Sequence, residues 1–173
     1  MHVAPHLKGF MEQHPSLSIN LTLSDDFIDI VAGGYDLAIR IADLSDSSLV
    51  ARRLAPVRRV LCASRSYVDQ HGLPQTIEDL KNHRCLPAHN NDLWRLEGPE
   101  GAFNLRPEGL LVTNSSEVIR EAVISGLGIA LRSTWDIGPE LKSGALVQVL
   151  PAYEGSKNVA LSAVYSSRRF LPA

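Results

Sequence analysis

Apolar positions recur with two different periods near the start of the chain. Leu7, Phe10 and Met11 lie at helical spacing and Pro15 ends that run, so the sequence predicts an N-terminal helix. Every second residue from 17 to 23 is then apolar, which is typical of a strand with one solvent-facing side. The change of period therefore predicts a helix followed by a strand.

A short helix over residues 26–32 and a second strand over residues 35–41 are predicted next. Ser24 is a plausible N-cap for this helix, and Asp25 follows in the first turn, where the helix dipole favours acidic side chains. The glycine pair at 33–34 allows a left-handed helix end. The resulting α-β-α-β order favours a parallel sheet covered by helices.

The rest of the chain continues to alternate between strand and helix patterns. Two extended runs surround Pro56, and a hairpin is predicted over residues 94–106 because Gly98, Pro99 and Gly101 supply its turn. Asn114 is predicted to start an amphipathic helix over 115–128, with Glu117 as its capping partner. Further helices are predicted at 66–72, 76–83 and about 135–142, and further strands at 84–89, 110–113, 129–132, 144–150 and 158–167.

The strand at 158–167 is left over from the second group of elements and could return to the first sheet. A chain that crosses out and back in this way forms two lobes with a hinge between them. Ligands commonly bind where strand ends and helix N-termini converge, so the region between the lobes is the predicted binding site.

Composition narrows the class of protein. The 173 residues favour one domain or two small ones, and 45% apolar with 21% charged residues is typical of a globular protein. A net charge of −2 gives no overall attraction to nucleic-acid backbones or anionic lipid. Cys62 and Cys85 fall inside predicted strands, which favours buried free thiols in a reducing compartment. With no bilayer-spanning stretch and no secretory pattern at the N-terminus, the predicted location is the cytoplasm.

Catalytic and metal motifs have little support. No Gly-x-Ser-x-Gly sequence is present, and the histidines fall at predicted helix ends and in loops. His83, Cys85 and His89 are a conceivable zinc trio, but their spacing matches no common zinc site. The glycines of "GLGIA" close a helix and open a strand, the reverse of a dinucleotide-binding loop. We therefore predict no catalytic residue, no metal and no cofactor.

Polar residues at element junctions are better candidates for ligand binding. Ser24 and Asp25 open one predicted helix, while Asn114 and Ser115 open another, so each pair joins polar side chains to free backbone N–H donors. Taken singly, each is more often a plain N-cap. Arg40 ends its strand and could equally form a surface ion pair.

Taken together, these segments resemble the effector-binding domain of LysR-type transcriptional regulators. The resemblance covers nearly the whole chain in the family's order. The matching runs are "PHLKGFMEQHPSLSINLTLSD", "IVAGGYDLAIRIADLSDSSLVARRL", "LCASRSYVDQHGLPQTIEDLKNHRCL", "NSSEVIREAVISGLGIALRS" and "LKSGALVQVLP".

The resemblance implies the α/β fold of type 2 periplasmic solute-binding proteins, with two lobes, an inter-lobe cleft and two crossover strands. Lobe one would comprise residues 1–63 plus 157–173, and lobe two residues 64–156. The resemblance also implies a set of residues around the effector in the cleft. These are Ser24, Asp25, Arg40, Ser64, Asn90, Trp94, Asn114, Ser115 and Gly128.

The function implied is regulatory. A small-molecule effector, anionic in view of the helix N-termini, would shift a homodimer or tetramer between arrangements. DNA contact is expected only through the helix-turn-helix that the family carries before this domain and that these residues lack. Two other functions fit the same fold: a transport solute-binding protein, and less favourably an enzyme on the two-lobe scaffold.

Overall fold

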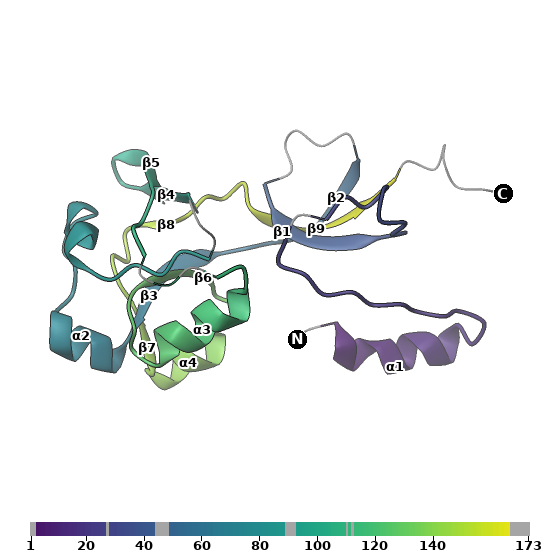
Figure 1. Ribbon diagram of the computed structural model, residues 1–173, viewed down its shortest axis with the longest axis horizontal. Coiled ribbons are helices and arrows are strands. Elements are labelled where there is room, and N and C mark those ends of the chain that lie inside the picture. The colour runs from purple at the N-terminus through teal and green to yellow at the C-terminus, as the bar shows by residue number, and fades with distance from the viewer. Residues whose placement is uncertain are drawn as a thin grey trace.

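The strands form two separate sheets (Figure 1). The computed structural model describes residues 3–26, 28–43, 49–88, 93–109, 111 and 113–166. The three-stranded sheet has the order β1 (Ala38–Ala42), β9 (Ala160–Tyr165), β2 (Val50–Pro56). The six-stranded sheet has the order β5 (Gly101–Leu105), β4 (Trp94–Gly98), β8 (Glu154–Gly155), β3 (Arg59–Ser64), β6 (Ala130–Ser133), and β7 (Leu146–Gln148) also pairs with β3.

The chain crosses between the sheets twice, from β2 to β3 and from β8 to β9. The prediction that the last strand returns to the first sheet is confirmed. We call the two parts of the molecule the three-stranded lobe and the six-stranded lobe. Strand β3 belongs to the six-stranded sheet from Arg59 onward, and the exact lobe boundaries at 63/64 and 156/157 remain a prediction.

The predicted parallel arrangement is wrong, because the ladders between the named strands are antiparallel. Strand β9 lies between β1 and β2 and runs against both, so that Val164 faces Ala38 on one side and Ala51 on the other. The strand predicted at 84–89 is reduced to one parallel bridge between Cys85 and Ile129. The alternation of helix and strand patterns could not reveal that a distant segment inserts between two strands that are close in sequence.

The six-stranded lobe has a core on both faces of its sheet. On β3, Val60 and Cys62 pack on one side with α3 (Ser116–Ile124) and α4 (Gly138–Ser143). Leu61 and Ala63 pack on the other side with α2 (Arg65–His71), the 3₁₀ helix η1 (Glu78–Asn82) and the β4–β5 hairpin. Five of the six residues of β3 are buried, which identifies β3 as the centre of the fold.

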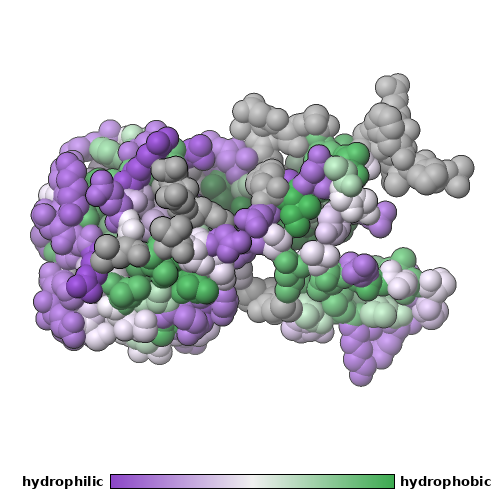
Figure 2. All heavy atoms as spheres, in the orientation of Figure 1, coloured by the Kyte–Doolittle hydropathy of each residue, from purple (hydrophilic) through white to green (hydrophobic). Residues whose placement is uncertain are grey.

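The three-stranded lobe is covered far less. Ile30 and Val164 are buried, but Ile39, Ile41 and Leu54 on its strands are exposed. Helix α1 (Ala4–Gln13) has no buried residue, and in Figure 1 it lies below the three-stranded sheet. Figure 2 shows hydrophobic side chains gathered on the surface of this half of the molecule.

Two predicted elements of this lobe do not form. Residues 17–23 are not in a strand, and none of the described strands pairs with them, so their alternating leucines stay exposed. The helix predicted at 26–32 is replaced by a turn over residues 30–34. There the Asp29 Oδ1 atom accepts the N–H groups of Val31 and Ala32 at 2.9 and 3.1 Å. This local side-chain bond offers the backbone an alternative to the helix.

Predictions for the other elements hold more closely. Helix α1, the β4–β5 hairpin and the extended runs around Pro56 are confirmed. The helix predicted at 76–83 is present as the 3₁₀ helix η1, and at its start Thr76 and Asp79 cap each other reciprocally. Helix α3 is capped by Ser115 rather than Asn114, and the strand predicted at 110–113 falls partly outside the described residues.

Candidate functional site at the N-terminus of helix α3

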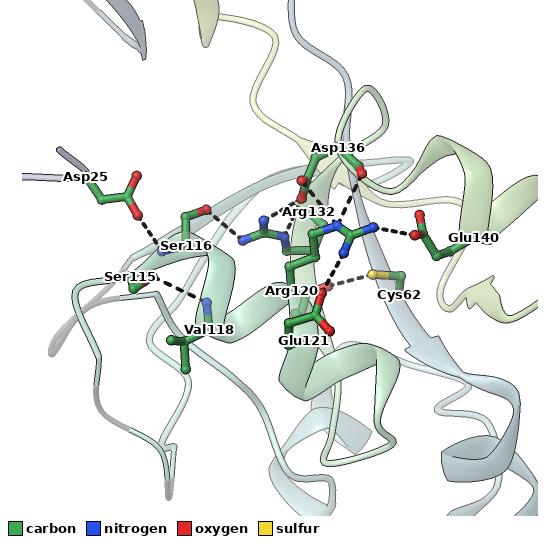
Figure 3. A network of polar contacts seen from close by, with 11 residues as sticks. Asp25, Cys62, Ser115, Ser116, Val118, Arg120, Glu121, Arg132, Asp136 and Glu140 are labelled. Atoms are coloured by element: carbon green, nitrogen blue, oxygen red, sulfur yellow. Dashed lines mark hydrogen bonds and ion pairs between the residues drawn. The ribbon is translucent and has the colours of Figure 1, made fainter. Parts of the chain in front are cut away.

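The acidic segment Ser24–Asp26 meets the first turn of α3, although about ninety residues separate them in the sequence (Figure 3). The Asp25 Oδ2 atom accepts the backbone N–H of Ser116 at 2.5 Å. The Asn114 Nδ2 group donates to Asp26 Oδ2 at 3.4 Å. The structure thus brings together Ser24, Asp25, Asn114 and Ser115 of the predicted set.

The acidic segment is held on the side of the three-stranded lobe. The Ser24 Oγ atom accepts the N–H of Asp26 at 3.1 Å, which shapes the turn that carries both aspartates. Farther along, the Arg40 guanidinium on β1 donates to the carbonyl of Ile28, and Ile30 is buried. Arg40 therefore links the chain two residues after the acidic segment to the sheet. Of the two helix N-termini predicted to face the ligand, the one at Ser24 does not form, and only that of α3 is present.

The first turn of α3 is fixed by side chains around it. The Ser115 Oγ atom accepts the N–H of Val118 at 3.4 Å, as an N-cap does. The guanidinium of Arg132, on β6, donates from Nη1 to Ser116 Oγ at 2.9 Å. Arg132 is 7% exposed and its charge is matched by Asp136, whose Oδ2 atom accepts from both Nε, at 3.0 Å, and Nη2. A buried arginine thus holds the residue whose N–H meets Asp25.

A second arginine completes the polar network. Arg120 forms ion pairs with Glu121 at 2.6 Å, with Asp136 at 3.6 Å and with Glu140. Burial works against its charge, but the carboxylates of Glu140, Asp136 and Glu121 raise the pKa of Arg120 above its ordinary value. Three carboxylates face two guanidinium groups, so the network leaves no surplus positive charge. Attraction for an anion at this point comes from the N–H groups and dipole of α3.

Three residues of the predicted set lie away from the first turn of α3: Ser64, Trp94 and Gly128. Ser64 is 3% exposed and caps α2 by accepting the N–H of Tyr67 at 3.1 Å. A Cβ on Gly126 would lie 3.1 Å from Ser64 Oγ, which puts Ser64 at the opposite end of α3 from Ser115. The nine residues of α3 span ~14 Å at the usual helical rise. Ser64 and Ser115 are thus separated by about the length of that helix.

Trp94 and Gly128 are part of the packing of the six-stranded lobe. Trp94 is 1% exposed and belongs to the core on one face of the sheet. A Cβ on Gly128 would lie 2.2 Å from the carbonyl oxygen of Arg84, so only glycine allows the two backbones to approach this closely. Asn90 lies outside the described residues.

Ser116 opens the predicted helix together with Asn114 and Ser115, but the charged residues around it were not predicted from the sequence: Arg120, Arg132, Asp136 and Glu140. A signal for two of them exists, because Arg132 ends an apolar strand pattern and Asp136 follows four residues later. A charged residue inside an apolar run suggests a buried ion pair. The contact of Asp25 with α3 has no local signal at all.

Buried and half-buried titratable groups in the six-stranded lobe also have shifted pKa values. The Tyr67 hydroxyl lies 3.1 Å from His83 Nδ1, and burial and the neighbouring His71 lower the pKa of His83. Burial raises the pKa of Cys62 to about 12 and that of Cys85 to about 11. Among the described residues, no three His, Cys, Asp or Glu side chains gather closely enough to hold a metal ion, and His89 of the conceivable zinc trio lies outside them.

Two open cavities lie away from the first turn of α3. One, of about 320 Å³, is lined by residues 73–75 and 148–153, and the other, of about 290 Å³, by Glu97, Gly98, Pro151, Ala152, Glu154 and Lys157. In the part of the chain that the structure describes, no helix has the length and apolar character needed to cross a membrane.

Comparison with known proteins gives a consistent family. The model of the LysR substrate binding domain matches residues 1–173. The chain is 40% identical over 170 residues to the HTH-type transcriptional regulator DmlR of Escherichia coli K12, covering 96% of this chain and 55% of that protein. The chain therefore spans about half the length of this regulator.

Solved structures agree with the sequence comparison. The regulatory domain of AphB from Vibrio vulnificus superposes with a TM-score of 0.81 at 31% identity, covering 99% of this chain and 86% of that one. The regulatory domain of CrgA from Neisseria meningitidis, a LysR-type regulator, gives a TM-score of 0.81 at 29% identity, with coverage of 99% and 85%. Both neighbours support the two-lobe α/β fold predicted from the resemblance. The chain belongs to the LysR substrate-binding domain family.

Proposed function

We propose that this chain is the effector-sensing part of a transcriptional regulator and binds a small carboxylate or similar anion between its lobes. The observation that carries the proposal is the Asp25 carboxylate on the Ser116 N–H. It supports the idea that the first turn of α3 accommodates a carboxylate in this fold. Charge-assisted hydrogen bonds of this kind are about twice as strong as neutral ones.

The proposed effector site is formed by Ser24, Asp25, Arg40, Asn90, Asn114 and Ser115, and the effector's carboxylate would take the place on the Ser116 N–H that the Asp25 carboxylate occupies here. Ser64, Trp94 and Gly128 would act more remotely, through the cap of α2, the core and the close backbone approach at Arg84. Effector binding would then favour one lobe arrangement over another without any chemical step. The buried thiols, with their raised pKa values, are poor nucleophiles, which supports a binding role rather than a catalytic one.

DNA contact by the regulator is assigned to a helix-turn-helix in the full-length protein. Support comes from the basic run at 52–59 of this chain, whose arginines do not form one phosphate-binding surface. Arg58 of that run is paired with Glu154 at 2.6 Å, while Arg52 and Arg53 are consecutive on a strand and so point to opposite faces. Such a surface is a poor phosphate-binding patch. The proposed location is the cytoplasm, in keeping with two buried free thiols.

A homodimer, alone or within a tetramer, is the proposed assembly. Phe10 and Met11 on α1 are 46% and 43% exposed, and burying them against a second copy would remove apolar surface from water. Analytical ultracentrifugation at micromolar concentration would detect the dimer. A single species at the monomer mass of 18.9 kDa would contradict it.

The effector proposal is tested by a thermal-shift screen of small carboxylates followed by calorimetry of the best hit. Ser115→Ala should weaken binding by about 1 kcal/mol, the usual net contribution of one hydrogen bond. Ser143→Ala, an exposed serine on α4, is the control and should leave the affinity unchanged. A hit whose affinity is the same in variants of Ser24, Arg40 and Ser115 would show that the site lies elsewhere.

A further inference from the structure

The Ser116 N–H, which a bound anion would need, already has an acceptor within the chain. Asp25 Oδ2 lies 2.5 Å from it. Other donors at this end of α3 are also engaged, since the N–H of Ser115 bonds Thr113 Oγ1 at 3.0 Å and the N–H of Val118 bonds Ser115 Oγ at 3.4 Å. The first turn therefore already holds a carboxylate in this structure.

The carboxylate comes from the other lobe. The segment that carries Asp25 continues to Ile28, whose carbonyl accepts the Arg40 guanidinium of β1, and to the buried Ile30. On the opposite side, Ser116 is held by Arg132, which is anchored to Asp136 (Figure 3). Both partners of the contact are thus fixed to different sheets, and a movement of one sheet relative to the other would separate them.

We propose that Asp25 is an internal latch that holds the three-stranded lobe against α3 and competes with the anionic effector for the Ser116 N–H. This inference rests on the proposed function, because the competing ligand is the anion proposed there. The Asp26–Asn114 contact at 3.4 Å acts as a second, weaker attachment of the same segment. An effector carboxylate would replace the Asp25 carboxylate and release the lobes from this arrangement.

The latch makes effector binding weaker than the site alone would allow. A ligand that must first displace Asp25 binds only the fraction of molecules in which the latch is open, so its apparent affinity falls by that fraction. Removing the latch should therefore strengthen the binding of a small carboxylate. An ordinary electrostatic effect of removing one negative charge would instead be reproduced by neutralising another acid on the same lobe, such as the exposed Asp36.

Position 116 offers a matched pair of variants for the latch itself. Ser116 is the first helical residue of α3, where proline is well tolerated because its missing N–H has no helical acceptor. Ser115, with φ −100° and ψ 116°, already has the extended backbone that a following proline requires. Ser116→Pro removes the hydroxyl and the N–H, whereas Ser116→Ala removes only the hydroxyl.

The experiment measures the distance between spin labels on the two lobes, placed by Arg53→Cys on β2 and Lys142→Cys on α4, both exposed positions. The buried native thiols should not compete for label. We expect a broader, longer distance distribution in Asp25→Ala and Ser116→Pro than in wild type, Ser116→Ala and Asp36→Asn. Equal distributions in all five proteins, or the same opening in Ser116→Ala as in Ser116→Pro, would overturn the latch.

A titration with succinate, followed by NMR, tests the competition separately. Asp25→Ala should bind succinate about tenfold more tightly than wild type, while Asp36→Asn should match wild type. Binding that is equally strong with and without Asp25 would overturn the competition. If succinate and the other screened carboxylates bind no variant, the anionic effector of the proposed function is wrong, and the label distances alone decide the latch.

Discussion

Both lobes are built on antiparallel strands, yet among the described residues only the six-stranded sheet is covered on both faces. In the six-stranded lobe, residues of β3 are buried on both sides. In the three-stranded lobe, β2 has no buried residue and α1 contributes none either. Apolar alternation is present in both lobes, so the difference lies in which neighbours cover the apolar face. Coverage by neighbouring elements, rather than pattern, therefore makes the six-stranded lobe the better-packed half of the molecule.

The largest predicted effect is a difference in thiol reactivity within the six-stranded lobe, between buried cysteines and an exposed one. With pKa values of about 12 and 11, Cys62 and Cys85 hold very little thiolate at pH 8, and both are buried. We expect them to react with an aromatic disulfide reagent at least about a hundredfold more slowly in the native protein than in denaturant. Ser143→Cys supplies an exposed thiol on α4 as a control, and rapid native reaction of all thiols alike would show that this lobe opens readily.

Core truncations should separate the lobes by stability. Leu61→Ala removes a fully buried side chain from the centre of β3 and should cost about 2–5 kcal/mol of unfolding free energy. Leu23→Ala, at a position 68% exposed, should change it by less than about 0.5 kcal/mol. Urea unfolding of both variants measures the comparison. Equal losses would mean that residues 17–23 are buried in solution, for example by a second copy.

Ion pairs should also contribute differently to stability in the two lobes, because one pair is buried and the other is exposed. Asp136→Ala leaves the Arg132 guanidinium buried without its partner and should destabilise the protein by about 3 kcal/mol. Glu12→Ala breaks the exposed Lys8–Glu12 pair on α1 and should change stability by about 0.5 kcal/mol or less. If the two substitutions have the same small effect, Arg132 is solvated and cannot hold Ser116 as described.

The sequence predicts the elements of the six-stranded lobe better than those of the three-stranded lobe. Around β3 the predicted helices, hairpin and strands are nearly all present, because local pattern and packing agree there. The strand at 17–23 and the helix at 26–32 failed because a strand needs a partner and because Asp29 bonds its own turn. The position of β9 between β1 and β2 is a long-range property that no local pattern encodes.

The candidate site was predictable only in part. Helix-capping chemistry pointed to Ser115 and its neighbours, and that end of α3 does carry the polar contacts. Trp94 and Ser64 were included through the resemblance, yet both side chains are buried within the six-stranded lobe. The Arg132–Asp136 pair and the approach of Asp25 depend on tertiary packing, which spacing along the chain does not reveal.

The smallest predicted effect is a dependence on pH. Burial lowers the pKa of His83, so the fold favours its neutral form. The resulting stability is present above the ordinary histidine value of about 6.5 and is lost as the pH falls through that value towards the lowered one. Between pH 7.5 and 5.5 the melting temperature should fall by about 1–2 °C more in wild type than in His83→Gln. An identical fall in both proteins would assign the effect to other groups.

Mapping a bound carboxylate would show whether an anionic effector binds between the lobes at the first turn of α3. The measurement is an amide NMR titration of isotope-labelled protein with the best hit from the carboxylate screen. A carboxylate bound there should give its largest shifts together at residues 24–26 and 114–116, and Ser115→Ala should weaken all of these shifts in parallel. Saturating shifts confined to the cavity at residues 73–75 and 148–153, with 24–26 and 114–116 unchanged, would contradict it.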